Sequence, residues 1–317
     1  MKVAVDVMGG DFAPEEIVAG ALWWGRENPA EQLLLVGRQD IIIAELEKYT
    51  YDKSQIQIIP ASQIIEMDEA PAMALRKKKD SSIVVATGLV KQNLADAVVS
   101  CGNTGAQMAA ALFLLGRMEK VERSPIVTSI PTVTGKPSLL MDIGANVDCK
   151  PGQLVQFALL GKAYASILGV DNPKIGLLNN GEEETKGNST AVETYQLMRN
   201  TKNLNFIGNI EGRDIFSGKC DVIVCDGFVG NILLKSLEGV TMFIARQVMK
   251  ELGKIPSVFE SLDYAKVGGA PLLGVNGISI VCHGSSKREA VFNGIKVAQE
   301  CFKKDIIKLQ HVEIAAY

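Results

Sequence analysis

Strand-like and helix-like stretches alternate along the whole 317-residue chain. The first pair sets the pattern: Lys2–Val7 has the composition of a strand, and Pro14, Glu15 and Glu16 suit the first turn of a helix. Repeated strand–helix alternation is typical of parallel strands with helices covering both faces. The sequence therefore predicts an α/β fold, a three-layer α/β/α arrangement with a mostly parallel sheet, as a single domain over residues 1–317.

Five of the predicted strands end beside glycine and a small polar or histidine residue. Because the carboxyl ends of parallel strands lie at one edge of a sheet, and open α/β sheets bind ligands there, we expect a polar cleft at this edge. The alternative is that small residues simply let helices pack closely on strands. The residues at these ends are Gly102, Asn103, Thr104, Gly105, Asp142, Asn146, Asn179, Asn180, Asp226, Gly230, His283 and Ser285.

One strand end has the form of an anion site. The strand 97–100 leads through the turn 102–105 into the apolar helix QMAAALFLLGRM. The backbone N–H groups at a helix start lack partners within the helix and carry the positive end of its dipole. This turn therefore predicts binding of an anion, for which phosphate is the natural candidate.

A second strand end carries a lysine within a charged loop. The strand 174–179 is followed by the polar loop Asn180–Asn188, in which Lys186 comes after the acids Glu182–Glu184, and a helix starts near Ser189. The loop is either an exposed connection with solvated charges or a ligand-binding loop that contributes a cation. The residues of the loop alone leave both interpretations open.

Composition and missing motifs exclude several classes of function. The net charge of −3 argues against nucleic acid as a partner. The sequence has no GxGxxG after its first strand, no GxxxxGK[ST], no GxSxG and no HExxH, and its six cysteines and two histidines lack zinc-site spacing. A reaction whose nucleophile is already an anion, such as phosphate attacking an activated acyl group, suits a chain with few histidines and none of these motifs.

The chain starts directly in a strand, and no apolar run approaches the roughly 18 residues of a spanning helix, which predicts a cytoplasmic protein.

Two further stretches each have two interpretations. The run Arg76–Lys79 is a solvated helix end or a docking patch for an acidic partner. The helix Gly230–Lys250 has apolar residues at helical spacing and is a core or dimer face, or else a membrane surface.

The ordered motifs resemble the PlsX family of bacterial phosphate acyltransferases over nearly the whole chain. The matching segments are VDVMGGD from Val5, SCGNTGA from Ser100, MDIGANVD from Met141, GLLNNGEEETKGN from Gly176, FIGNIEGRD from Phe206, DGFVGN from Asp226, GGAPLLG from Gly268 and HGSS from His283. The resemblance implies acyl transfer from acyl-[acyl carrier protein] to inorganic phosphate at the start of phospholipid synthesis. It further implies a fold like that of phosphotransacetylases and isopropylmalate dehydrogenases, and catalytic roles for Lys186 and Asn231.

The resemblance also implies partners. These are acyl carrier protein, inorganic phosphate, a second copy of the chain in a homodimer, and a membrane acyltransferase that consumes acyl phosphate, which leaves open a peripheral position at the membrane. It implies no cofactor and no metal. Two alternatives to acyl-carrier chemistry are an acyl-coenzyme A donor and a non-catalytic scaffold for membrane lipid enzymes.

The sequence departs from the family pattern at two places. Phe12 stands where the family usually has a histidine, so an imidazole base is missing there. The segment Leu252–Val267 is shorter than the helical hairpin that the family tends to carry, which puts membrane association through this segment in doubt.

Overall fold

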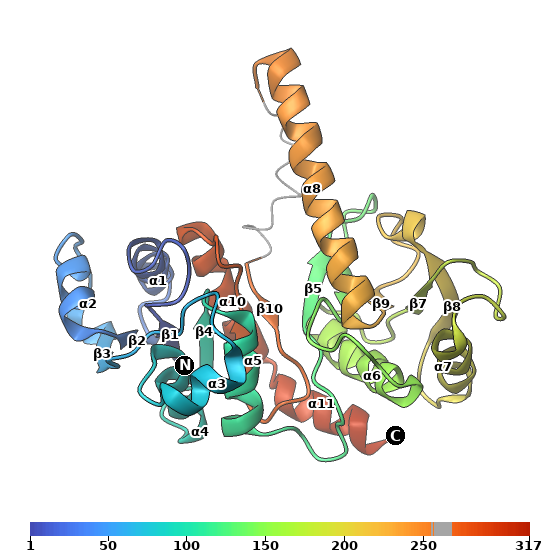
Figure 1. Ribbon diagram of the computed structural model, residues 1–317, viewed down its shortest axis with the longest axis horizontal. Helices are drawn as coiled ribbons and strands as arrows, with labels where there is room; N and C mark the ends of the chain where they lie inside the picture. Colours follow the sequence, from blue (N-terminus) through green and yellow to red (C-terminus); the bar gives the residue numbers. More distant parts are fainter. Residues whose placement is uncertain (255, 257–267) are drawn as a thin grey trace. The chain divides into compact units, whose positions relative to one another are not determined.

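The computed structural model describes residues 1–254, 256 and 268–317, and the chain divides into two compact units. Unit 1 consists of Met1–Met118 with Tyr264–Ile307, and unit 2 of Glu119–Asp263 with Lys308–Tyr317. Each unit has its own sheet and its own helices (Figure 1). The single domain expected over residues 1–317 stays a prediction.

Unit 1 is built on a six-stranded sheet whose strand order is β10-β11-β4-β1-β2-β3. All neighbouring strands are parallel except β10 and β11, which are antiparallel. The central strands β1 and β4 are almost wholly buried, as expected for aliphatic runs with helices on both sides. The strands are β1 (Lys2–Asp6), β2 (Gln32–Gly37), β3 (Ile56–Pro60), β4 (Ala97–Ser100), β10 (Ala270–Pro271) and β11 (Ile278–Val281).

Close approach of backbones holds the helices of unit 1 in place. At Gly20 of α1, an added Cβ would lie 2.5 Å from the Arg288 carbonyl oxygen of α10, so only glycine permits this packing. The helices are α1 (Glu15–Glu27), α2 (Gln39–Leu46), α3 (Pro71–Lys77), α4 (Ser82–Lys91), α5 (Thr104–Ala110), which continues as a π-helical turn η2 (Ala111–Leu115), and α10 (Arg288–Lys303), with a short 3-10 turn η1 (Lys53–Gln55).

Unit 2 is built on a five-stranded sheet in the order β5-β6-β9-β7-β8, in which only β5 is antiparallel to its neighbour. Its strands are β5 (Val127–Ile130), β6 (Ser138–Met141), β7 (Ile175–Asn179), β8 (Phe206–Glu211) and β9 (Val222–Val224). Its helices are α6 (Pro151–Ile167), α7 (Ser189–Asn200), the 3-10 turn η3 (Gly212–Asp214), α8 (Gly227–Leu252) and, from residue 308 onward, α11 (Ile306–Ala315).

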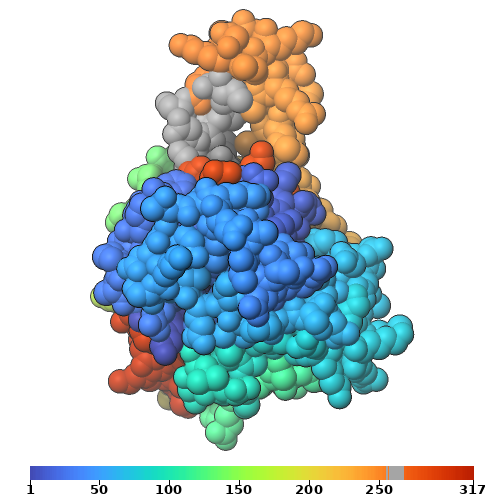
Figure 2. Space-filling model, turned by 90° about the vertical axis from the view of Figure 1, so that its left-hand side faces the viewer, coloured from blue at the N-terminus to red at the C-terminus, as the bar shows by residue number. Residues whose placement is uncertain are grey.

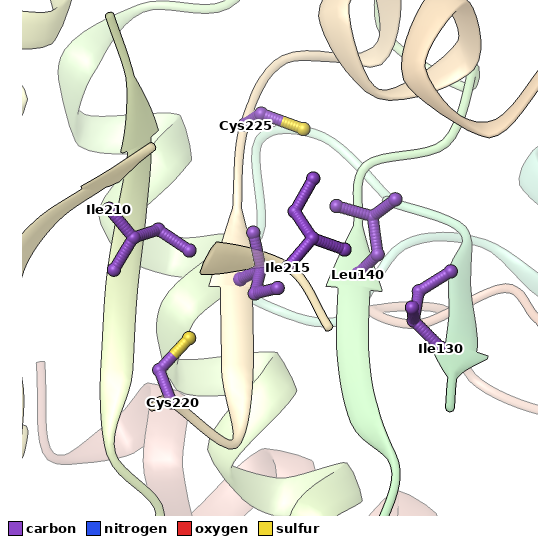
Figure 3. Close-up of a cluster of buried hydrophobic side chains, with 7 residues drawn as sticks. Ile130, Leu140, Ile210, Ile215, Cys220 and Cys225 are labelled. Carbon is purple, nitrogen blue, oxygen red and sulfur yellow. The ribbon is translucent and has the colours of Figure 1, made fainter. Parts of the chain in front are cut away.

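A buried cluster fills one face of the unit 2 sheet. Its side chains come from neighbouring strands and from the turn after β8 and point toward one another (Figure 3). Leu233, Leu234 and Leu237 from the first turns of α8 pack against it. The core interpretation of this helix is therefore confirmed for its start. The cluster consists of Ile130, Leu140, Ile210, Ile215, Cys220, Ile223 and Cys225.

The rest of α8 is largely exposed. Only Gly227 and Gly230 are buried in it, while Val240 and Phe243 are 55% and 63% exposed. By length and composition alone α8 could cross a membrane, because an 18-residue window in it has a mean hydropathy of 1.4. The sequence expectation concerned uninterrupted apolar runs, which Lys235 and Glu238 break in α8, whereas a window judged by mean hydropathy tolerates two such charges.

Two other sequence expectations concern the polar strand ends and the segment 252–267. The five polar strand ends do not share the edge of one sheet, because β4 and β11 belong to unit 1 while β6, β7 and β9 belong to unit 2. Strand–helix alternation is the same for one long sheet and for two shorter ones, so the sequence pattern could not separate these cases.

Most of the segment 252–267 lies outside the described residues, and its comparison with a helical hairpin stays a prediction.

Candidate active site

In unit 1, a buried carboxylate joins the loops after β1 and β4. Asp6 is 2% exposed, and its Oδ2 accepts a hydrogen bond of 2.7 Å from the Ser100 hydroxyl, whose oxygen accepts one of 3.0 Å from the Gly102 N–H. Burial raises the pKa of Asp6, and hydrogen bonds to its carboxylate oppose this shift. A Cβ at Gly9 would lie 2.7 Å from the Gly102 nitrogen, so the two glycine loops are in direct contact.

The predicted phosphate turn has one asparagine that is fully engaged within the protein. The Asn103 Oδ1 caps α5 by accepting from the Ala106 N–H at 3.0 Å. Its Nδ2 donates to the carbonyl oxygens of Glu66, Met67 and Glu69 at 3.1 to 3.2 Å. These bonds favour a structural role for the Asn103 side chain and leave the backbone at Thr104 and Gly105 as the part of the turn suited to an anion.

The loop after β11 lies beside the loop after β1. The Asp11 N–H donates to the Gly284 carbonyl oxygen at 2.8 Å, and the His283 Nδ1 and the Ser285 hydroxyl are 2.7 Å apart. The Phe12 side chain is 42% exposed, and the Lys287 ammonium lies 5.4 Å from its ring centroid. Unit 1 thus brings together three of the predicted loops at neighbouring strand ends, in the order β11, β4, β1.

In unit 2, Asp142 holds the loop after β6. Its side chain is completely buried and accepts hydrogen bonds from five N–H groups, at 2.7 to 3.2 Å. Burial raises the pKa of Asp142, and these donors oppose this shift. A carboxylate so surrounded favours a positioning role over direct contact with phosphate. The donors are the backbone N–H groups of Ile126, Gly144, Ala145 and Asn146 and the Asn146 side-chain amide.

The loop held by Asp142 supports the start of α8. The Gly227 N–H donates to the Asn146 carbonyl oxygen at 2.7 Å, and a Cβ at Gly230 would lie 1.9 Å from the Asp142 carbonyl oxygen. Asp226 caps the helix by accepting from the Val229 N–H at 2.8 Å. A Cβ at Gly144, whose φ is +136°, would lie 3.6 Å from the Asn231 side chain, so Asn231 rests against this loop in the first turns of α8.

The loop after β7 is shaped by Asn179. Its Oδ1 accepts from the Asn180 N–H at 2.8 Å, and its Nδ2 donates to the Lys186 carbonyl oxygen at 3.0 Å. Gly187 has a φ of +97°, and a Cβ there would lie 2.6 Å from the Asn179 Oδ1. The strand end therefore fixes the backbone of the loop on both sides of Lys186.

Two of the three acids in this loop form ion pairs with residues outside it. Glu182 pairs with Lys219 at 2.6 Å, and Glu184 pairs with Arg199 at 2.7 Å. The Lys186 side chain is exposed, and its ammonium has no ion-pair partner within the described part of the chain. Two of the three acids thus anchor the loop to neighbouring elements and leave the Lys186 ammonium available for a ligand.

A pocket of about 680 Å³ opens at the ends of β7 and β9. Its apolar wall includes Leu177, Leu178 and Val229, and its polar rim includes Asn179, Asn180, Asp226, Asp148, Asn188 and Thr190. The first three rim residues were predicted as site residues, whereas the last three were missed. Asp148 lies within the motif MDIGANVD, and Asn188 and Thr190 follow the lysine loop, so only their nearness to motifs could have pointed to them.

No thiol in this pocket is suited to act as a nucleophile. Cys149 lines the pocket, and burial, with Asp142 as a further cause, raises its pKa to about 12. All six cysteines are free, and five of them are buried. Within the described residues, the one group of acids close enough for a metal consists of Glu182, Glu211 and Asp214, and each of these has a cationic partner in Lys219 or Arg213.

Solved structures define the fold class. A phosphotransacetylase from Streptococcus pyogenes aligns with a TM-score of 0.64 and 19% identity over 95% of this chain and 94% of that chain. A branched-chain phosphotransacylase from Enterococcus faecalis V583 aligns with a TM-score of 0.61 and 18% identity, covering 95% and 99%. The chain therefore has the α/β fold of the phosphotransacetylases, as predicted; the expected likeness to isopropylmalate dehydrogenases stays a prediction.

Sequence comparisons give the family. Residues 1–309 match the model of the family described as "Fatty acid synthesis protein". A phosphate acyltransferase of Syntrophomonas wolfei is 59% identical over 316 residues, with 99% of each chain covered. Another from Dictyoglomus turgidum is 49% identical over 323 residues, covering 97% and 96%. The chain therefore belongs to the fatty acid synthesis protein family and is a PlsX-type phosphate acyltransferase. This confirms the resemblance to that family and the expectation that the protein is an enzyme.

Proposed function

We propose that this phosphate acyltransferase takes a long-chain fatty acyl group from an acyl carrier protein thioester and transfers it to inorganic phosphate. A phosphate oxygen attacks the thioester carbonyl carbon, the carbon–sulfur bond breaks, and the carrier thiol takes up a proton. The products are acyl phosphate and free carrier protein. The observation that carries this proposal is the unpaired Lys186 ammonium on a loop fixed by Asn179, at a strand end that also lines an amide-rimmed pocket.

The proposed chemistry needs only positioning and electrostatic stabilisation. The phosphate is already an anion, so the enzyme needs no side-chain nucleophile, in agreement with the raised pKa of Cys149. A cation such as Lys186 stabilises the phosphate or the negative charge that develops on the carbonyl oxygen, and the Asn231 amide can donate to the same centre. The remaining predicted site residues then bind phosphate through backbone N–H groups or position these two side chains.

The proposal extends to partners and location. We propose a homodimer in the cytoplasm, peripheral at the membrane, whose product is consumed by a membrane acyltransferase. Support comes from the exposed apolar side chains of α8, which a second copy or a lipid surface would cover. The non-catalytic scaffold interpretation is set aside, because the relatives that match nearly the full chain are phosphate acyltransferases.

The donor is tested by comparing two thioesters of the same fatty acid. Purified protein is mixed with phosphate and either acyl carrier protein thioester or acyl-coenzyme A, and release of the thiol is followed. We expect phosphate-dependent release with a kcat/KM at least about tenfold higher for the carrier protein, a difference of about 1.4 kcal/mol in transition-state stabilisation. A preference for acyl-coenzyme A would reassign the donor, and release that is independent of phosphate would refute the proposed reaction.

Asn231→Ala is expected to lower kcat by roughly tenfold to a hundredfold, less than the loss of a charged donor, because a neutral amide forms weaker hydrogen bonds to an oxyanion. Steady-state kinetics with the carrier thioester measures the effect. Asn200→Ala, at an exposed asparagine of α7 in the same unit, is the matched control and should leave kcat unchanged. An effect on KM alone would assign Asn231 to substrate binding.

A further inference from the structure

The helix α3 presents an exposed face of mixed apolar and cationic character. Met73, Arg76 and Lys77 are exposed and follow the i, i+3, i+4 spacing, which places them on one side of the helix. Lys79 follows just beyond the helix end, and Met67 on the preceding loop is 49% exposed. These five residues are called the α3 patch below.

The other side of α3 is anchored to unit 1. Ala74 is buried, and the Lys78 ammonium donates to the Ile64 carbonyl oxygen at 2.6 Å and pairs with Glu69. Lys78 therefore has a structural role, although it belongs to the same basic run in the sequence. The remaining three cations of the run have no ion-pair partner within the described residues, in a chain whose net charge is −3.

The α3 patch is attached to the predicted phosphate turn. The helices α3 and α5 are in contact (Figure 1). A Cβ at Gly105 would lie 2.6 Å from the Pro71 ring. The Asn103 amide also binds three carbonyl oxygens of the loop that contains Met67. The segment around α3, cyan in Figure 2, lies at the molecular surface. A partner bound to the patch would therefore be held close to a loop of the candidate site.

We propose that the α3 patch is the docking surface for the acyl carrier protein, an inference that rests on the proposed function. The carrier protein is acidic, so the three cations would accelerate its encounter and fix its orientation. The two methionines offer adaptable apolar contacts at the centre of such an interface. The exposed acids Glu66 and Asp68 flank Met67 on the loop before α3, so the attraction of an acidic partner falls to the three cations at the helix and its end.

The test is the charge-reversal variant R76E/K77E/K79E. We expect the KM for the acyl carrier protein thioester to rise about tenfold to a hundredfold with little change in kcat, because docking is lost but the site is intact. Turnover of a small acyl-pantetheine thioester, which needs no docking, should stay as in the wild type. The wild-type kcat/KM for the carrier thioester should also fall as salt rises from about 0.05 to 0.3 M, whereas that of the variant should change little.

The matched control is K53E/K91E/K303E, which makes the same change in net charge at exposed lysines of unit 1 away from α3. Equal losses in both variants would overturn the proposal by showing that only net charge matters. Direct binding of the carrier protein without its acyl group, measured by fluorescence anisotropy, separates docking from function. Equal affinity of wild type and R76E/K77E/K79E, or no binding by the wild type, refutes the docking surface, whereas binding without phosphate-dependent turnover refutes the proposed function alone.

Discussion

Replacing Lys186 by alanine is expected to lower kcat by about a hundredfold to a thousandfold, the loss typical of removing a donor to a developing oxyanion. The Lys186 ammonium has no ion-pair partner within the described residues, so its removal breaks no salt bridge. The free energy of unfolding should therefore stay within about 0.5 kcal/mol of the wild type, as for an ordinary surface substitution. Steady-state kinetics with saturating phosphate and carrier thioester measures kcat, and chemical denaturation measures the free energy of unfolding.

Lys202→Ala provides the control for charge, because Lys202 is also an exposed lysine of unit 2. It should leave kcat unchanged. Lys186→Arg should recover part of the lost rate, since a guanidinium keeps the charge but donates with a different geometry. A wild-type rate in Lys186→Ala would remove this residue from the mechanism.

Replacing Gly230 by alanine is expected to lower the free energy of unfolding by about 3 kcal/mol or more, at the upper end of overpacking effects. The added Cβ would lie 1.9 Å from the Asp142 carbonyl oxygen, which belongs to the backbone and cannot rotate away. Relief requires α8 to move from the loop after β6, and this movement would displace Asn231 as well. Urea denaturation measures the stability, and kcat should fall in the fraction that remains folded.

Gly239→Ala is the matched control on the same helix. Gly239 is exposed, and an added Cβ there would meet nothing within 4 Å. Alanine should raise the free energy of unfolding by about 0.5 to 1 kcal/mol, because it restricts the unfolded chain and favours helix. If both substitutions had the same sign, the packing of Gly230 on Asp142 would not explain the first result.

Much of the local structure could be predicted from the sequence. The strand at Ala97–Ser100 and the helix start at Ser189 agree with the structure to the residue, because aliphatic runs and a capping asparagine at position 188 are strong local signals. The strand ends also identified residues that line the unit 2 pocket, namely Asn179, Asn180 and Asp226. These successes depend on short-range patterns.

The remaining features depend on contacts between distant parts of the chain. The helix α10 ends at Lys303 and is followed by α11, with Asp305 at a φ of +51° between them. The sequence suggested Asp142 as a cleft residue, but its carboxylate is saturated by donors that only the folded loop brings together. The division into two sheets likewise depends on which strands pair.

The order of strands in unit 1 has a consequence for synthesis on the ribosome. The strand β11 pairs with β4, yet it comes last among the strands and is separated from β4 by all the strands of unit 2. Until residue 281 has emerged, the backbone groups along that side of β4 lack their native partner. Unpaired aliphatic edges of this kind promote association between chains. Nascent chains that stop within unit 2 should therefore depend on chaperones, and a fragment ending before β11 should be prone to aggregate.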